Sequence, residues 1–401
     1  MIEPAEILAA AKRYEQDTVR FLCDMVRVPS FSCEEGDVVR VIKAGMEKAG
    51  FDEARVDGLG NVIGRVGSGP RIIAFDAHVD TVMEGARSQW KRDPFGPVVE
   101  DGRVWGRGTV DQEGGMASMV CAGRIIKDLG LAGDLAVLFT GTVMEEDCDG
   151  LCWQYIIREG GIRPEVVVIT EPTNMNIYRG HRGRMEMKVR LSGVSCHGSA
   201  PERGVNAVYR ASRVALEIEK LNGRLRTDPF LGKATVAVTE CGSSSPSLCA
   251  VPDGAVLHLD RRMVRGETRE SAIAEVLEAA RSAGVGDAAV EVPVYEEVSH
   301  TDLVYPMEKY YPTWVLEEDS PHLARAVSVY RDLFGKDPMV DKWTFSTNGV
   351  AIMGMHGIPC LGLGPGNEVL AHAPNEACPV EHLTHAAAFY AAFAARMAGT
   401  A

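Results

Sequence analysis

Residues 71–80 read RIIAFDAHVD, an apolar run that ends in a histidine and an aspartate. A continuous apolar stretch of this kind is typical of a central strand in a sheet that is covered on both faces. Two similar runs follow, LAVLFT at residues 135–140 and VVVIT at residues 166–170. Helices are predicted between them, at residues 114–129 and 151–159. Strands that alternate with helices predict an α/β domain with helices on both faces of the sheet.

The same α/β pattern extends to both sides of these strands. The further predicted elements are helices at residues 4–28, at residues 36–50 and from Pro321 onward, and strands at residues 61–66 and 360–363. Because they share the period and composition of the central elements, residues 1–181 and 299–401 are predicted to form one large domain.

The pattern changes near residue 182. Residues 184–191 alternate between polar and apolar side chains, as in a strand with one exposed face. The elements predicted after it are a helix at 206–221, strands at 234–239 and 255–262, a helix at 268–283 and a strand at 288–294. This βαββαβ order predicts a small two-layer α+β domain of the ferredoxin-like kind. Residues 182–298 are thus expected to be an insertion in the large domain.

The composition excludes several classes of partner. The chain has 401 residues and a net charge of −14, without a long Lys/Arg run, so neither nucleic acid nor an anionic membrane is expected to bind. The start, MIEPAE, lacks the features of a signal peptide, and no apolar run is long enough for a transmembrane helix. We therefore expect a cytoplasmic protein whose ten cysteines are reduced thiols.

Side chains that can bind metal ions lie at the ends of several predicted strands and in neighbouring loops. They are His78, Asp80, Asp111, Glu145, Glu146, Glu171 and His372. In open α/β sheets, ligands bind at the carboxyl edge of the strands, where such residues meet. Five segments each contribute at least one such group, and one group from each gives two histidines and three carboxylates, the mixed nitrogen and oxygen ligand set of Zn²⁺, or alternatively of Co²⁺ or Mn²⁺. If five ligands serve two metals, one carboxylate must bridge them.

Three longer stretches carry a family resemblance. They are DQEGGMASMV at residues 111–120, EEDCDGLCWQ at residues 145–154 and DKWTFSTNG at residues 341–349. Over essentially its whole length the chain resembles the di-zinc aminoacylase and carboxypeptidase family, which includes succinyl-diaminopimelate desuccinylase, acetylornithine deacetylase and glutamate carboxypeptidase. The three stretches resemble most closely the hydrolase of this family that is linked to selenium metabolism. The resemblance implies a phosphorylase/hydrolase-like α/β catalytic domain and a homodimer, with the insertion as lid and dimerisation domain.

The resemblance also implies a role for each metal-capable residue. His78 and Glu171 would hold one zinc ion, Glu146 and His372 would hold the other, and Asp111 would bridge them.

Two further carboxylates would support these ligands. Asp80 would accept a hydrogen bond from the far ring nitrogen of His78 and fix its tautomer. Glu145 would be the general base, which takes a proton from the water between the metals and hands it to the leaving amine.

The insertion contains a second set of candidate residues. His197, in GVSCHGSAP at residues 193–201, resembles the family histidine that reaches the partner subunit's active site and stabilises the oxyanion. Asn206 begins the next helix and would hold this loop or contact the substrate. Arg262 resembles the family arginine that binds a substrate carboxylate, whereas Arg261 points the other way on the strand and is expected to be structural.

The C-terminal part of the large domain supplies the remaining candidates. Thr347 and Asn348 are expected to line the substrate pocket.

These residues predict a hydrolase that cleaves an amide-type bond in a small amino-acid-like substrate. The bond could be an N-acyl amide, an N-carbamoyl group or a peptide bond. A dipeptidase or aminopeptidase is the main alternative, and a catalytically silent metal-binding scaffold is a second one. A metal-dependent lyase would also use carboxylates, and only a product assay separates it from a hydrolase.

Overall fold

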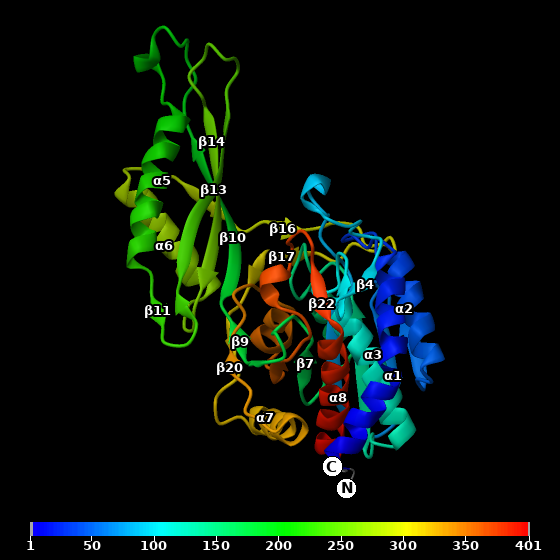
Figure 1. Ribbon diagram of the computed structural model, residues 1–401. Coiled ribbons are helices and arrows are strands. Elements are labelled where there is room, and N and C mark those ends of the chain that lie inside the picture. The colour runs from blue at the N-terminus through cyan, green and yellow to red at the C-terminus, as the bar shows by residue number, and fades with distance from the viewer. Residues whose placement is uncertain (1–2, 400–401) are drawn as a thin grey trace.

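The computed structural model describes residues 3–399. It has two parts (Figure 1): a large α/β body at the lower right of the view, and a narrower lid at the upper left. The lid consists of the inserted segment, and the chain reaches it through β10. The predicted architecture, an α/β domain with an inserted α+β lid, is confirmed.

The body is organised around a mixed sheet of eight strands. In spatial order they are β1 (Glu53–Val56), β2 (Val62–Val66), β6 (Leu135–Thr142), β3 (Arg71–His78), β7 (Val167–Ile169), β21 (Cys360–Gly362), β8 (Ile177–Tyr178) and β20 (Val340–Asp341). The four central strands, β6, β3, β7 and β21, run parallel to their neighbours in this group. Their carboxyl ends therefore meet at one edge, and the loops that leave this edge are positioned by a buried scaffold.

Helices cover this sheet. They are α1 (Pro4–Val26), α2 (Gly36–Lys48), α3 (Glu113–Leu129), α4 (Leu151–Arg158), α7 (Pro321–Phe334) and α8 (Val380–Met397), with a short π-helix, η3, at Val350–Met355. Helices α1, α3 and α8 pack against one another (Figure 1). On β3, the Phe75 ring stacks on Phe139 at 5.4 Å and contacts Tyr390 of α8 at 5.3 Å. Aromatic packing thus fixes the strand that ends at the predicted metal site.

The lid is a sheet with helices on one face. Its strands are β13 (Thr235–Ser244), β14 (Gly254–Met263), β10 (Gly183–Ser192) and β15 (Ala289–Glu291), with β18 (Tyr310–Tyr311) beside β10, and its helices are α5 (Ala207–Arg224) and α6 (Arg269–Ser282). Along β10, Met185 and Met187 are buried in the lid's own core, whereas Arg184 and Glu186 are only partly buried. The alternation predicted for residues 184–191 is confirmed.

Shorter elements complete the two parts. They are β4 (Val98–Glu100), β5 (Arg103–Trp105), β9 (Gly180–His181), β11 (Thr227–Asp228), β12 (Gly232–Lys233), β16 (Val294–Tyr295), β17 (Met307–Glu308), β19 (Trp314–Val315) and β22 (Ala377–Pro379), and the 3₁₀ turns η1 (Arg87–Gln89), η2 (Pro201–Arg203) and η4 (Glu368–Leu370). Strands β9 and β19 pair where the chain enters and leaves the lid. The boundaries at residues 182 and 298 stay predictions. Within residues 3–399, no helix combines the length and the apolar character that crossing a membrane requires.

Candidate metal centre

The carboxyl edge of the central strands brings the five predicted ligands together. Nε2 of His78, at the end of β3, lies 3.0 Å from Oδ1 of Asp111 and 3.5 Å from Oε1 of Glu171. Nε2 of His372 lies 3.2 Å from Oδ2 of Asp111 and 2.9 Å from Oε2 of Glu146. The two oxygens of Asp111 therefore face different histidines. This arrangement suits a carboxylate that bridges two cations.

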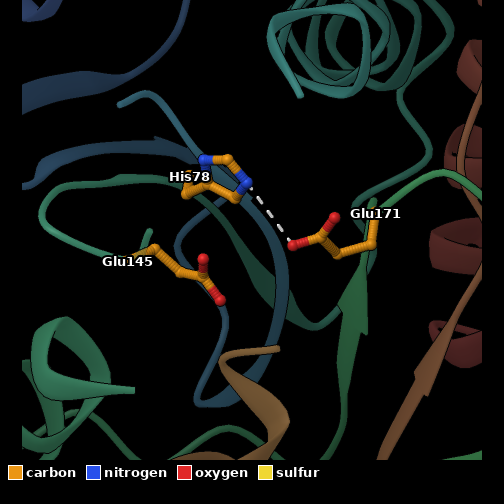
Figure 2. Close-up of side chains that lie close together, drawn as sticks. All are labelled: His78, Glu145 and Glu171. Carbon is orange, nitrogen blue, oxygen red and sulfur yellow. Dashed lines mark ion pairs between the residues drawn. The ribbon is translucent and has the colours of Figure 1, made fainter. Parts of the chain in front are cut away.

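Glu145 belongs to the same cluster. Its carboxylate, His78 and Glu171 offer ligand atoms within 4.8 Å of one another, as do His78, Asp111 and Glu146. Figure 2 shows His78, Glu145 and Glu171 pointing their polar ends toward one another from three separate segments. Geometry alone thus allows Glu145 to be a ligand as well as a base.

Two oxygens in this cluster indicate that a cation fits there. Oε1 of Glu145 and Oε2 of Glu171 are buried and have no hydrogen-bond partner among the described residues. A buried carboxylate oxygen without a donor is costly, and a cation is its natural partner. Together with the nitrogen and oxygen donor set, these atoms fit a divalent metal of the zinc type.

The cluster concentrates negative charge. Burial, together with the charge of Asp111, raises the pKa of Glu146 to about 7 and that of Glu171 well above its usual value. Burial is also the largest cause that raises the pKa of Glu145, helped by the neighbouring Asp149 and Glu171. For Asp111, burial acts in the same direction, but hydrogen bonds from the two histidines outweigh it and lower the pKa. Cations at the site would relieve this repulsion.

The structure shows backbone contacts beside the predicted contact between His78 and the Asp80 side chain. Nδ1 of His78 donates to the backbone carbonyl of Asp80 at 2.8 Å, while the Asp80 carboxylate lies 3.6 Å away. The carbonyl therefore fixes the tautomer that leaves Nε2 free for a metal. The carboxylate of Asp80 instead accepts the backbone N–H groups of Glu145 at 3.2 Å and Glu146 at 3.0 Å. Its side chain positions the loop after β6.

Residues of the loop between α1 and α2 support Asp80, and the sequence did not reveal them. The hydroxyl of Ser32 donates to Oδ2 of Asp80 at 2.7 Å. The buried carboxylate of Glu35 accepts the backbone N–H groups of Cys33 and Met144. Burial and the charge of Asp80 raise the pKa of Glu35 to about 8. A polar loop far away in the sequence gave no signal for this role.

His372 is the outermost member of the cluster. Its side chain is 54% exposed, whereas that of His78 is 1% exposed. Its backbone has a positive φ of 58°, and its ring nitrogen Nε2 lies beside Asp111 and Glu146.

Thr347 and Asn348 are buried, with 0% and 2% of their surface exposed. The hydroxyl of Thr347 lies 3.0 Å from Nε2 of the buried His181. The amide of Asn348 donates to Asp76 and Thr142, and its oxygen accepts the backbone N–H of Gly150. Their polar side-chain atoms are engaged inside the protein, and the expectation that these side chains line the substrate pocket stays a prediction.

His197 and Asn206 of the lid make their hydrogen bonds within the lid itself. The His197 ring accepts a hydrogen bond from the backbone N–H of Ser199, and no hydrogen bond or ion pair within residues 3–399 joins it to the predicted ligands. Asn206 caps α5, because its side chain accepts the N–H groups of Val208 and Tyr209. A cap explains this asparagine without a substrate contact.

The two lid arginines have different surroundings. Arg261 is buried and donates to Glu267 and Glu275, as expected for a structural residue. Arg262 is partly exposed and makes two hydrogen bonds to Asp260, at 2.9 and 3.1 Å.

The chain is similar in sequence to several known proteins. The model of peptidase family M20/M25/M40 matches residues 74–396. The uncharacterized protein YgeY of Escherichia coli is 55% identical over 386 residues, which cover 96% of each chain. Succinyl-diaminopimelate desuccinylase of Cereibacter sphaeroides is 31% identical over 250 residues, covering 59% of this chain and 65% of the relative.

Solved structures share the fold. Aminopeptidase PepT of Bacillus cereus superposes with a TM-score of 0.73 at 21% identity, covering 96% of this chain and 99% of PepT. YXEP of Bacillus subtilis, described as a dinuclear metal binding peptidase, superposes with a TM-score of 0.71 at 16% identity, covering 97% of this chain and 100% of YXEP. At these identities the likeness shows the fold alone.

Proposed function

The chain belongs to peptidase family M20/M25/M40, and we propose that it is a two-metal hydrolase that cleaves an amide-type bond in a small amino-acid-like substrate. The observation that carries this proposal is the position of Asp111 between His78 and His372, with Glu146 and Glu171 on either side. Two cations that lie close together need a carboxylate that binds both of them.

The chain's own residues divide the work as follows. His78 and Glu171 would hold one cation, Glu146 and His372 the other, and Asp111 both. Zn²⁺ is the proposed metal, with Co²⁺ or Mn²⁺ as alternatives. When bound, such a pair supplies Lewis acidity and lowers the pKa of a water molecule at the site.

Glu145 would serve as the general base. Its carboxylate lies beside His78 and Glu171, and Oε1 is free of hydrogen bonds within the described residues. That oxygen can accept a proton from the attacking water and pass it to the nitrogen of the leaving amine. Asp80 would hold the backbone of Glu145 and Glu146 in place during this transfer.

The lid would supply the substrate contacts. Arg262 is proposed to bind a substrate carboxylate and His197 to stabilise the oxyanion from the partner subunit. A dimer through the lid is proposed because β13 is an edge strand and Tyr209 and Leu216 of α5 expose 66% and 59% of their surface.

A panel of substrates tests the proposal. Zinc-loaded protein is incubated with N-acetyl, N-succinyl and N-carbamoyl amino acids and with dipeptides, and the release of free amine is measured. We expect turnover of at least one class, and turnover lower by roughly two to four orders of magnitude with the Glu145→Gln variant. Turnover of dipeptides alone would favour the alternative, a dipeptidase or aminopeptidase. Metal binding without turnover of any compound would favour a silent scaffold, and an unsaturated product would indicate a lyase.

A further inference from the structure

A buried ion pair joins the two loops that carry Asp111 and His372. Nη1 of Arg107 lies 2.7 Å from Oε2 of Glu376, and both side chains are almost fully buried, with 2% and 0% of their surface exposed. Arg107 lies in the loop between β5 and α3, which contains Asp111. Glu376 lies four residues after His372, directly before β22.

The carboxylate of Glu376 also binds the backbone of the Asp111 loop. Oε1 accepts the N–H groups of Val110 at 2.6 Å and Asp111 at 3.0 Å, and Oε2 accepts that of Gly108 at 3.2 Å. One side chain thus satisfies three N–H groups and a guanidinium. A neutral side chain of this size offers fewer acceptor sites and would leave Arg107 buried without a counter-charge.

The surrounding contacts hold this pair from both sides. Strand β22 pairs with β5, and the backbone N–H of Gly106 donates to the carbonyl of Glu376 at 3.1 Å. The ring of Trp90 lies 5.1 Å from the Arg107 guanidinium. The side chain of Asn375 accepts the N–H of Lys91 and donates to the carbonyl of Gln89. The loop of His372 is therefore fixed to the Asp111 loop by Glu376 and to residues 89–91 by Asn375.

We propose that Glu376, paired with Arg107, is a positioning residue that sets the distance between Asp111 and His372. It would thereby set the affinity for the second metal, the cation that Glu146 and His372 would hold. The inference rests on the proposed two-metal function. His78 and Glu171 lie at the ends of β3 and β7, which the central sheet positions directly. His372 is on a loop, more than half exposed, and depends on the Arg107–Glu376 pair. Loss of the Arg107–Glu376 pair should therefore lower the affinity for the second metal and leave the affinity for the first unchanged.

The test uses the double variant Arg107→Met/Glu376→Gln, which removes both charges and nearly keeps the volume, so that no unpaired charge is buried. Metal-free proteins are titrated with Co²⁺, and binding is followed by visible absorption and calorimetry. The matched control is Arg261→Met/Glu267→Gln in the lid, where the pair is 2.6 Å apart, 1% and 2% exposed, and Glu267 likewise accepts a backbone N–H from Val264. Thermal melting of each metal-free protein reports the cost to the fold.

The wild type should bind two equivalents. The Arg107/Glu376 variant should bind the first with unchanged affinity and the second roughly 10- to 100-fold more weakly. The lid control should melt earlier and bind both equivalents as the wild type does. Two wild-type-like equivalents in the Arg107/Glu376 variant, or equal weakening of both, would overturn the role of Glu376 while leaving the two-metal function standing. A wild type that binds fewer than two equivalents would overturn both.

Discussion

Arg262 and Asp260 form a two-point ion pair on one face of β14, at 2.9 and 3.1 Å, although Arg262 is the residue proposed to bind substrate. Both side chains are partly exposed, at 28% and 29%. Asp260 therefore occupies the Nε/Nη2 edge of the guanidinium. A substrate carboxylate that binds this same edge must displace Asp260, which would make this residue an internal competitor, whereas a carboxylate on the Nη1/Nη2 edge would leave the pair intact.

Opposite effects on KM are therefore expected from the two residues. Arg262→Ala should raise KM for carboxylate substrates by roughly 10- to 100-fold, because charge-assisted hydrogen bonds are lost. Asp260→Asn should lower KM by roughly two- to fivefold, since a partly exposed ion pair is worth little but competes directly. Steady-state kinetics with a carboxylate substrate and its uncharged amide measure both. If Arg262→Ala raises KM equally for the carboxylate substrate and its uncharged amide, Arg262 supports the fold and does not bind the substrate carboxylate.

A separate prediction concerns Glu145. Glu145→Gln should lower kcat by roughly two to four orders of magnitude, the usual range for a lost acid–base group. Its metal content should stay at two equivalents, because the five other residues supply the ligands. Elemental analysis of the purified protein gives this number beside the kinetics. Loss of one metal would instead make Glu145 a ligand, as its position beside His78 and Glu171 allows.

The family likeness of His197 predicts that active sites are shared between subunits. His197→Ala and Glu145→Gln should each be nearly inactive alone. Coexpressed, half of the dimers are mixed and each mixed dimer has one intact site, so about a quarter of wild-type activity should return. Activity that never exceeds that of the single variants would place His197 in its own subunit's site or outside the mechanism. A fully active monomer on a sizing column would contradict the dimer itself.

The sequence predicted the scaffold of the site well and its contacts less well. The apolar run at residues 71–78 ends at His78, and the observed strand β3 has the same bounds, because burial on both faces demands an uninterrupted apolar run. Helix α8 was not predicted from the sequence. Its sequence VEHLTHAAAFYAAFAARM is buried on nearly every side, so it lacks the polar face that marks a surface helix.

Residue type alone did not reveal which partner a polar side chain would find. Thr347 and Asn348 are predicted pocket residues, and the fold brings His181, Asp76 and Thr142 to their polar atoms. Glu376 was visible in the segment around His372 and had no assigned role, since its partner Arg107 lies in a distant segment. Such pairs are products of tertiary structure, and spacing along the chain does not encode them.

The last prediction concerns His181, a buried histidine where the chain enters the lid. Burial lowers its pKa to about 4, from an ordinary value of 6.5. Its Nε2 accepts hydrogen bonds from the indole of Trp314 at 2.7 Å and the backbone N–H of Thr347 at 3.0 Å, so protonation would break both. Below pH 6.5 the unfolded chain binds a proton that the folded state does not bind until about pH 4. The stabilisation by the neutral ring is thus complete above pH 6.5 and is lost as the pH falls from 6.5 to about 4.

The size of this effect can be measured in metal-free protein by urea denaturation. Between pH 7 and pH 5, His181 should account for roughly 2 kcal/mol of lost unfolding free energy. His181→Gln should be less stable at pH 7, because the ring contacts are lost, but its stability should fall less steeply over the same interval. His197→Gln replaces a histidine at an exposed position and serves as the matched control. Parallel slopes in all three proteins would mean that His181 takes up its proton without unfolding this part of the chain.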